Sequence, residues 1–158
     1  MAKVRNITLI VMTIVAIVIG GQAEKEPSEV WVLCQPDSFV YVRQFPKKDS
    51  AEIGRLELGD IAWTDGKKKN GFLHIWVMGF ECDGYIKAGY VSRTPVQTCN
   101  IQAKIVSRGR VRARTCVKGK RRKWVKKDSL LWVYGYGEEW AVTSEGFVQM
   151  KFIEMEGI

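Results

Sequence analysis

The chain contains the same pattern of residues twice, and this repetition is the strongest constraint on its fold. Residues 84–92 read GYIKAGYVS and residues 146–154 read GFVQMKFIE. Each has a glycine, an aromatic and a β-branched residue, then three variable residues, then a second aromatic and β-branched pair. Further matches in the same order join 41–46 to 112–117, 54–64 to 123–133 and 71–75 to 139–143. This order predicts two copies of one structural unit.

Beyond Glu24 the apolar residues fall in short β-branched and aromatic runs, without helical periodicity over ten or more residues. The runs include EVWVLC, SFVYVR, FLHIWVM and SLLWVYGY, and turn pairs such as Asp65-Gly66 and Glu145-Gly146 lie between them. Many short strands at close spacing predict an all-β fold of two tandem small β-barrels. Alternation in residues 39–43 places Val40 and Val42 in the core.

Two glycines begin the most similar stretches of the repeats. Gly84 and Gly146 each stand directly before an aromatic and β-branched pair. A tight turn that enters a strand often needs a positive φ, which glycine adopts without strain. We therefore predict a positive φ at both positions.

The motifs of the two repeats resemble the bacterial SH3 (SH3b) domain family. The shared order is V-x-V-R, then I-G-x-L-x-x-G-D, a polar hairpin, a hydrophobic strand and G-[YFW]-[IV]-x-x-x-[YF]-[VIL]. In the first repeat the matching residues are Val42, Arg43, Pro46, Ile53, Gly54, Leu56, Gly59, Asp60, Phe72, Gly84, Tyr85, Ile86, Tyr90 and Val91. In the second they are Arg114, Trp124, Val125, Asp128, Trp140, Gly146, Phe147, Val148, Phe152 and Ile153. The resemblance implies two SH3-like barrels, at 30–93 and 105–155, joined by a linker at 94–104.

The first 23 residues have the pattern of a secretory signal peptide. Lys3 and Arg5 precede an uncharged apolar run from Ile7 to Ile19, and small residues at 21 and 23 fit a cleavage site. The run is shorter than the roughly 20 residues that span a bilayer core, which favours cleavage before Glu24. If it stays uncleaved, it would act as a membrane anchor. We expect a secreted or envelope-associated protein.

The positive charge is concentrated in the second half of the chain. Residues 24–97 carry 10 cationic and 11 acidic side chains, whereas residues 98–158 carry 13 and 6. A strand over residues 108–114 would align four arginines on one face, and a basic loop follows it. The predicted anion-binding residues are Arg108, Arg110, Arg112, Arg114, Lys120, Arg121, Arg122 and Lys123. Alternatively, this is a solvated face whose like charges oppose edge-to-edge strand pairing.

Four cysteines and one histidine set the options for covalent and metal chemistry. In an exported chain, disulfides Cys34–Cys82 and Cys99–Cys116 would each close within one half. Four buried thiols are the alternative. His74 is the sole histidine and the cysteines show no C-x-x-C spacing, so we expect neither a metal site nor a cofactor.

The SH3b resemblance implies a non-catalytic binding protein that recognises peptidoglycan or anionic wall polymers. The aromatic residues predicted to contact ligand are Tyr41, Trp132, Tyr134 and Tyr136. Nucleic-acid binding, or a scaffold role inside the cell, is the alternative function for the basic face. In the nucleic-acid alternative, the arginines and lysines would bind phosphates and Trp124 would stack on a base. It requires the N-terminal run to be an anchor with the repeats facing inward. An enzyme is disfavoured, because one histidine in an apolar strand supplies neither a nucleophile–base pair nor a metal centre.

Overall fold

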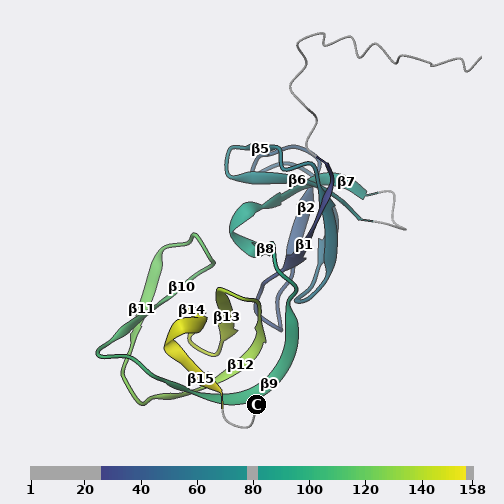
Figure 1. Ribbon diagram of the computed structural model, residues 1–158. Coiled ribbons are helices and arrows are strands. Elements are labelled where there is room, and N and C mark those ends of the chain that lie inside the picture. Colours follow the sequence, from purple (N-terminus) through teal and green to yellow (C-terminus); the bar gives the residue numbers. More distant parts are fainter. Residues whose placement is uncertain (1–25, 78–81, 156–158) are drawn as a thin grey trace, which may run out of the picture.

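A computed structural model describes residues 26–77 and 82–155. The chain is all-β, as predicted, and forms two antiparallel sheets that lie side by side (Figure 1). The predicted signal peptide lies outside the described residues. Within those residues, no helix has the length and apolar character needed to cross a bilayer.

Each sheet is built from consecutive strands. The first contains β1 (Ser28–Val32), β2 (Val40–Arg43), β3 (Glu52–Leu56), β4 (Ile61–Thr64), β5 (Lys68–Lys69), β6 (Phe72–Val77), β7 (Cys82–Lys87) and β8 (Val91–Ser92). The second contains β9 (Gln97–Ile105), β10 (Val111–Arg114), β11 (Arg121–Val125), β12 (Leu130–Tyr136), β13 (Trp140–Thr143), β14 (Gly146–Gln149) and β15 (Ile153–Met155). Single 3-10 turns precede β8 and β15: η1 (Ala88–Tyr90) and η2 (Met150–Phe152). We refer to residues 28–92 as the first repeat and residues 97–155 as the second.

The two sheets have the same strand order. The first runs β3-β2-β7-β6-β4-β1-β8, and the second runs β11-β10-β14-β13-β12-β9-β15. Counted along the chain, these orders are identical once the short β5, which pairs only with β6, is set aside. The repetition in the sequence therefore corresponds to a repeated strand topology.

The repeats also agree in register. A β-bulge separates Val42 from Arg43 in β2, and another separates Ala113 from Arg114 in β10. Arg43 then pairs with Tyr85, as Arg114 pairs with Phe147. The sequence alignment of 41–46 with 112–117 and of 84–92 with 146–154 places the same residues opposite one another.

Neither sheet closes into the predicted barrel. In each, the strand path ends in edge strands that pair on one side only, β3 and β8 in the first sheet and β11 and β15 in the second. The bulges give the reason. Beyond each bulge, the hairpin of β2 and β3, or of β10 and β11, is joined to the rest of its sheet by a single residue pair. A bulge bends and twists its strand, so these hairpins turn away from the opposite edge.

The predicted linker is wrong at its C-terminal end. Residues 97–104 belong to β9, which pairs with β12 from Gln97–Tyr136 to Lys104–Leu130. The segment alternates apolar Cys99, Ile101 and Ala103 with polar neighbours, so one side faces the core. Only residues 93–96 connect the two sheets.

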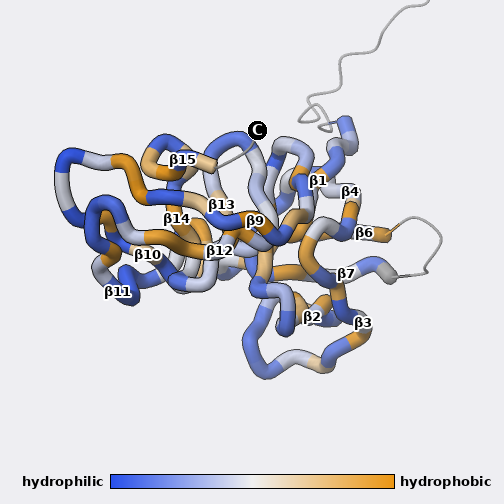
Figure 2. Tube along the Cα trace, turned by 90° about the horizontal axis from the view of Figure 1, so that it is seen from below, coloured by the Kyte–Doolittle hydropathy of each residue, from blue (hydrophilic) through white to orange (hydrophobic). Residues whose placement is uncertain are grey.

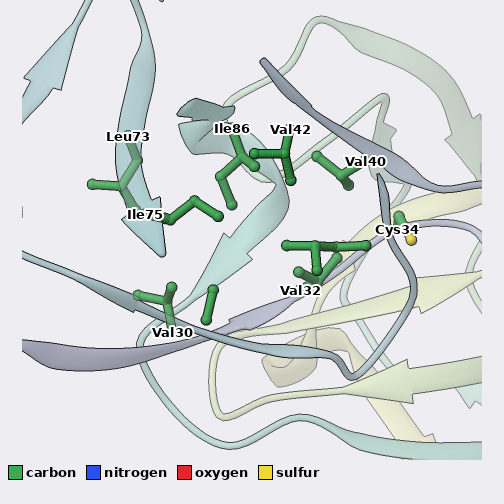
Figure 3. Packing of buried hydrophobic residues seen from close by; sticks show 10 residues of the cluster. Val30, Val32, Cys34, Val40, Val42, Leu73, Ile75 and Ile86 are labelled. Carbon is green, nitrogen blue, oxygen red and sulfur yellow. The ribbon is translucent and has the colours of Figure 1, made fainter. Parts of the chain in front are cut away.

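Three hydrophobic clusters hold the chain together. The cluster of the first repeat includes the predicted core residues Val40 and Val42, at 5% and 1% exposure. Ile86 lies beside Val42 in this cluster, and Val30 lies on its other side near Ile75 (Figure 3). An equivalent cluster lies in the second repeat. The third joins the repeats and consists of Leu33, Cys116, Val142 and Phe147, with Tyr90 and other half-buried residues around it. We call this third cluster the inter-repeat core.

The glycine prediction is correct at one of its two positions. Gly146 has φ +116° and is the first residue of β14, directly after the turn that follows β13. Gly84 does not have a positive φ, because it lies inside β7, opposite Ile75. Strand β7 begins at Cys82, two residues before Gly84, so Gly84 does not stand at the start of its strand. Gly84 is still required, since a Cβ there would lie 2.8 Å from the Arg43 carbonyl oxygen.

Candidate anion-binding groove

Strand β10 places two arginines on the outer face of the second sheet. Val111 and Ala113 are buried, so Arg112 and Arg114 point the other way. The predicted stripe of four arginines on one strand is wrong, because β10 begins only at Val111. Arg108 and Arg110 are exposed on the preceding loop. The chain bends there, and the Ser107 hydroxyl donates a hydrogen bond to the Gly109 carbonyl.

The basic run after β10 divides between a loop and a strand. Lys120 ends the loop, whereas Arg121, Arg122 and Lys123 are exposed residues of β11. Lys123 forms an ion pair with Glu145, so its charge is partly compensated. Hydrophilic residues dominate the β10 and β11 region (Figure 2).

Arginine and tryptophan side chains stack across β10 and β11. Arg112 lies opposite Trp124 in the register, and its guanidinium carbon is 4.0 Å from the centre of the Trp124 ring. The guanidinium carbon of Arg114 is 5.5 Å from the centre of the Trp140 ring. These distances are within the range of cation–π attraction.

These side chains border a groove of about 340 Å³, which we call the basic groove. Within the part of the chain that the structure describes, its walls contain four arginines, three aromatic side chains and no carboxylate. They are Arg110, Val111, Arg112, Arg114, Arg121, Trp124, Trp140, Gln149 and Phe152. Trp124 is 50% exposed, which leaves much of its surface free to contact a ligand.

The first repeat has a groove of about 310 Å³ at the equivalent position. The strand registers show which positions of the two grooves correspond. Where the second repeat has Arg110, Arg112 and Arg114, the first has Phe39, Tyr41 and Arg43. The arginine and the aromatic residue also exchange strands. In the first repeat, Tyr41 on β2 lies opposite Arg55 on β3, whereas in the second, Arg112 on β10 lies opposite Trp124 on β11.

The wall of the first groove includes two residues of the second repeat. Thr115 and Phe147 contribute to its wall. The second groove has no wall residue from the first repeat. The basic groove is therefore the more accessible of the pair, and the more cationic.

Of the four aromatic residues predicted to bind ligand, the structure places one in a groove. Tyr41 lines the first groove. Trp132 is 45% exposed but lies on β12, outside both grooves. Tyr134 packs against the inter-repeat core, and the Tyr136 hydroxyl donates to Gln97 Oε1 at 2.6 Å.

The sequence reasoning named Trp124 as a ligand contact only in the nucleic-acid alternative, where it would stack on a base, and it missed Trp140 and Phe152 as groove residues. A further signal for Trp124 was its position one residue before Val125, which the alignment matched to Leu56, a core residue in the structure. A residue next to a buried strand position faces outward.

The structure contains free thiols where disulfides were predicted. Cys34, Cys99 and Cys116 are not bonded to one another or to Cys82, whose side chain lies outside the described part. The Cys99–Cys116 pairing is wrong because the two residues pack in different clusters. Cys99 Sγ donates to the Val133 carbonyl at 3.3 Å, and Cys116 belongs to the inter-repeat core. Cys34 and Cys116 follow the alternative of buried thiols, whereas Cys99 is half-buried.

We predict slow alkylation of Cys34. Its side chain is buried, and burial, followed by the carboxylates of Asp60 and Glu57, raises the pKa of the thiol to about 11. At pH 8 about one thousandth of this thiol would be thiolate, the reactive form. Peptide mapping after iodoacetamide treatment should show slow labelling in buffer and rapid labelling in urea. Labelling in buffer as fast as that of free glutathione would contradict the burial of this thiol.

His74 lies between two carboxylates on the first sheet. Its Nε2 is 2.6 Å from Asp83 Oδ1 and its Nδ1 is 3.3 Å from Asp65 Oδ2. Burial opposes ionisation of Asp65, but hydrogen bonds from Lys67 and the nearby His74 hold the pKa of its carboxyl below the usual value. Within residues 26–77 and 82–155, no three His, Cys, Asp or Glu side chains are grouped to hold a metal ion.

Comparisons with known proteins give only distant structural similarity. No family model and no curated protein sequence matches the chain. The chain is similar to NlpC1 from Trichomonas vaginalis with a TM-score of 0.37 and 11% identity, over 85% of this chain and 48% of that one. For NlpC2 from the same organism the TM-score is 0.37 and the identity 11%, over 82% and 48%. The chain thus spans about half the length of each, and a likeness this weak carries no inference about function.

Proposed function

We propose that the chain is a non-catalytic binding protein of the bacterial cell envelope that holds an anionic wall polymer in the basic groove. One observation carries the proposal: four arginines and exposed Trp124 border one groove that has no carboxylate in its walls. Guanidinium groups bind carboxylate and phosphate through paired hydrogen bonds. An exposed indole ring offers a flat apolar surface to a sugar ring or other planar group.

Two further observations support the envelope as the place of binding. The sequence of residues 1–23 fits a secretory signal. The repeated strand order, with a 3-10 turn before each last strand, agrees with two SH3b-like units in tandem. In this proposal the units act as a rigid support, and the ligand is recognised by side chains on the outer face of β10 and β11.

A substitution pair tests the groove. Trp124 and Trp132 are both exposed tryptophans on strands of the second sheet, but only Trp124 lines the groove. We expect Trp124→Ala to weaken binding to bacterial cell walls by about ten-fold, since stacking on an aromatic side chain contributes roughly 1–3 kcal/mol. Trp132→Ala should bind as the unchanged protein does. Equal binding by both variants would contradict the proposal.

Co-sedimentation at low and high salt identifies the ligand class. The protein is mixed with intact walls, with walls stripped of anionic polymers, and with DNA-cellulose. We expect retention on intact walls that is lost after stripping and falls with salt, because charge supplies the attraction. Retention on stripped walls at high salt would indicate peptidoglycan instead. Retention on DNA-cellulose but not on cell walls would mean that the protein binds nucleic acid and not an envelope polymer. The stacked arginines and tryptophan also suit phosphates and bases.

A further inference from the structure

A second positively charged cavity lies between the two repeats. It has a volume of about 510 Å³, and it forms where the loop after β10 meets η1. Its wall shares no residue with the basic groove. We call it the inter-repeat pocket.

The backbone holds the two sides of this pocket close together. The Val117 N–H donates to the Gly89 carbonyl across the repeats, at 3.0 Å. A Cβ at Gly89 would lie 2.7 Å from Cys116 Sγ, so the loop and the 3-10 turn approach more closely than a larger residue allows. A Cβ at Gly119 would lie 2.8 Å from the same sulfur. The distance between the lysines of the two repeats is therefore set by packing beneath them.

Four lysines surround the pocket, two from each repeat. Lys68 and Lys87 come from the first repeat, and Lys118 and Lys120 come from the second. Among the described residues, no carboxylate lines the pocket. Across the part of the chain that the structure describes, Lys87, Lys118 and Lys120 form no ion pair, whereas Lys104 and Lys123 do. The Lys118 backbone N–H also donates to no protein acceptor within that part.

Lys87, Lys118 and Lys120 have no counter-charge among the described residues. Ammonium groups brought together by two separate units repel one another, and the repulsion opposes the docking of the repeats. Docking places them around one cavity in spite of this. A multiply charged anion in the cavity would attract all of these ammonium groups and so offset their repulsion. It would also accept a hydrogen bond from the Lys118 backbone N–H.

We propose that the inter-repeat pocket binds a compact phosphate-bearing anion, held by lysines from both repeats. Lysine is a point charge that suits the tetrahedral phosphate group, whereas the basic groove presents planar guanidinium groups and rings. The pocket is thus a second site with different chemistry, independent of the function proposed for the groove. Because its ligand contacts both repeats, binding stabilises their relative arrangement.

Pyrophosphate titration of the full-length chain tests this site. Calorimetry should show binding, and the midpoint of thermal unfolding should rise with pyrophosphate, since a ligand that binds only the folded state stabilises it. Sodium chloride at matched ionic strength should give a smaller rise. Short-chain phosphatidic acid, kept below its micelle concentration, is titrated in parallel, so that a free phosphate anion and a lipid headgroup are distinguished.

A double variant and a matched control locate the binding. Lys87→Gln with Lys118→Gln should weaken the binding of whichever probe binds by about ten-fold or more, because hydrogen bonds to charged groups are removed. Lys126→Gln with Lys127→Gln changes the net charge equally, on exposed residues outside the pocket, and should leave binding unchanged. No binding of either probe would overturn the proposal. Equal weakening in both double variants would overturn it too, since it would indicate net charge alone.

Discussion

Replacing Phe147 with alanine is expected to lower the free energy of unfolding by about 3–5 kcal/mol, the range for removing a buried aromatic ring. Phe147 is 1% exposed and lies in the inter-repeat core. Its ring centre is 6.2 Å from that of Tyr90, an edge-on contact between the two repeats. The change therefore removes packing inside the second repeat and across the boundary. Urea unfolding followed by tryptophan fluorescence measures the loss.

A second phenylalanine serves as the control. Phe45 is 55% exposed on the β2–β3 hairpin, so Phe45→Ala should change stability by no more than about 0.5 kcal/mol. Hydrogen exchange shows whether the boundary is affected. Amides around η1 and β8 in the first repeat should exchange faster in Phe147→Ala than in the unchanged protein. Faster exchange confined to the second sheet would mean that the ring does not hold the repeats together.

Residue patterns predict the local structure of this chain well. Alternation identifies Val40 and Val42 as core, and the repeated motifs align residues that occupy equivalent sheet positions. Both results depend on neighbours along one strand or on the same order of residues in two copies. Such information is fully contained in the sequence.

Features that depend on remote partners are less predictable. Barrel closure requires strands far apart in sequence to meet, and the bulges at Arg43 and Arg114 divert the strands that would do so. The predicted end of the linker was wrong because β9 becomes a strand by pairing with β12 and β15, which come much later in the chain. The role of Trp124 likewise depends on its partner Arg112 across the hairpin.

The inter-repeat pocket could not be predicted from the sequence either, because it too depends on residues that are far apart along the chain. Its lysines lie in two repeats, and Lys68 is far from Lys118 along the chain. The concentration of charge after residue 98 indicated a basic face but not a cavity shared with the first repeat. Packing of Cys116 against Gly89 brings the two groups of lysines together, and no local pattern encodes that contact.

Replacing Gly146 with valine is expected to destabilise the second repeat by about 3 kcal/mol, from backbone strain and overpacking together. Its φ of +116° is one that L residues rarely adopt, and an added Cβ would lie 2.6 Å from the Arg114 carbonyl oxygen. That carbonyl belongs to the residue where β10 joins β14, so the substitution also disturbs the basic groove. The midpoint of thermal unfolding should fall by about 6–12 °C. Gly109→Val is the matched control, because a Cβ at Gly109 has no neighbour within 4 Å and its φ is not positive.

Alanine at the two equivalent glycines separates strain from crowding. Gly84→Ala places a Cβ 2.8 Å from the Arg43 carbonyl oxygen and within 3 Å of the Ile53 and Val42 side chains, but with an ordinary φ. Gly146→Ala crowds only the Arg114 carbonyl oxygen below 3 Å, but keeps the positive φ. Because Gly84→Ala is the more crowded variant, a larger loss of unfolding free energy in Gly146→Ala would come from the left-handed backbone, which costs roughly 1–3 kcal/mol for a strained residue. A smaller loss in Gly146→Ala would mean that the positive φ at Gly146 imposes little conformational demand.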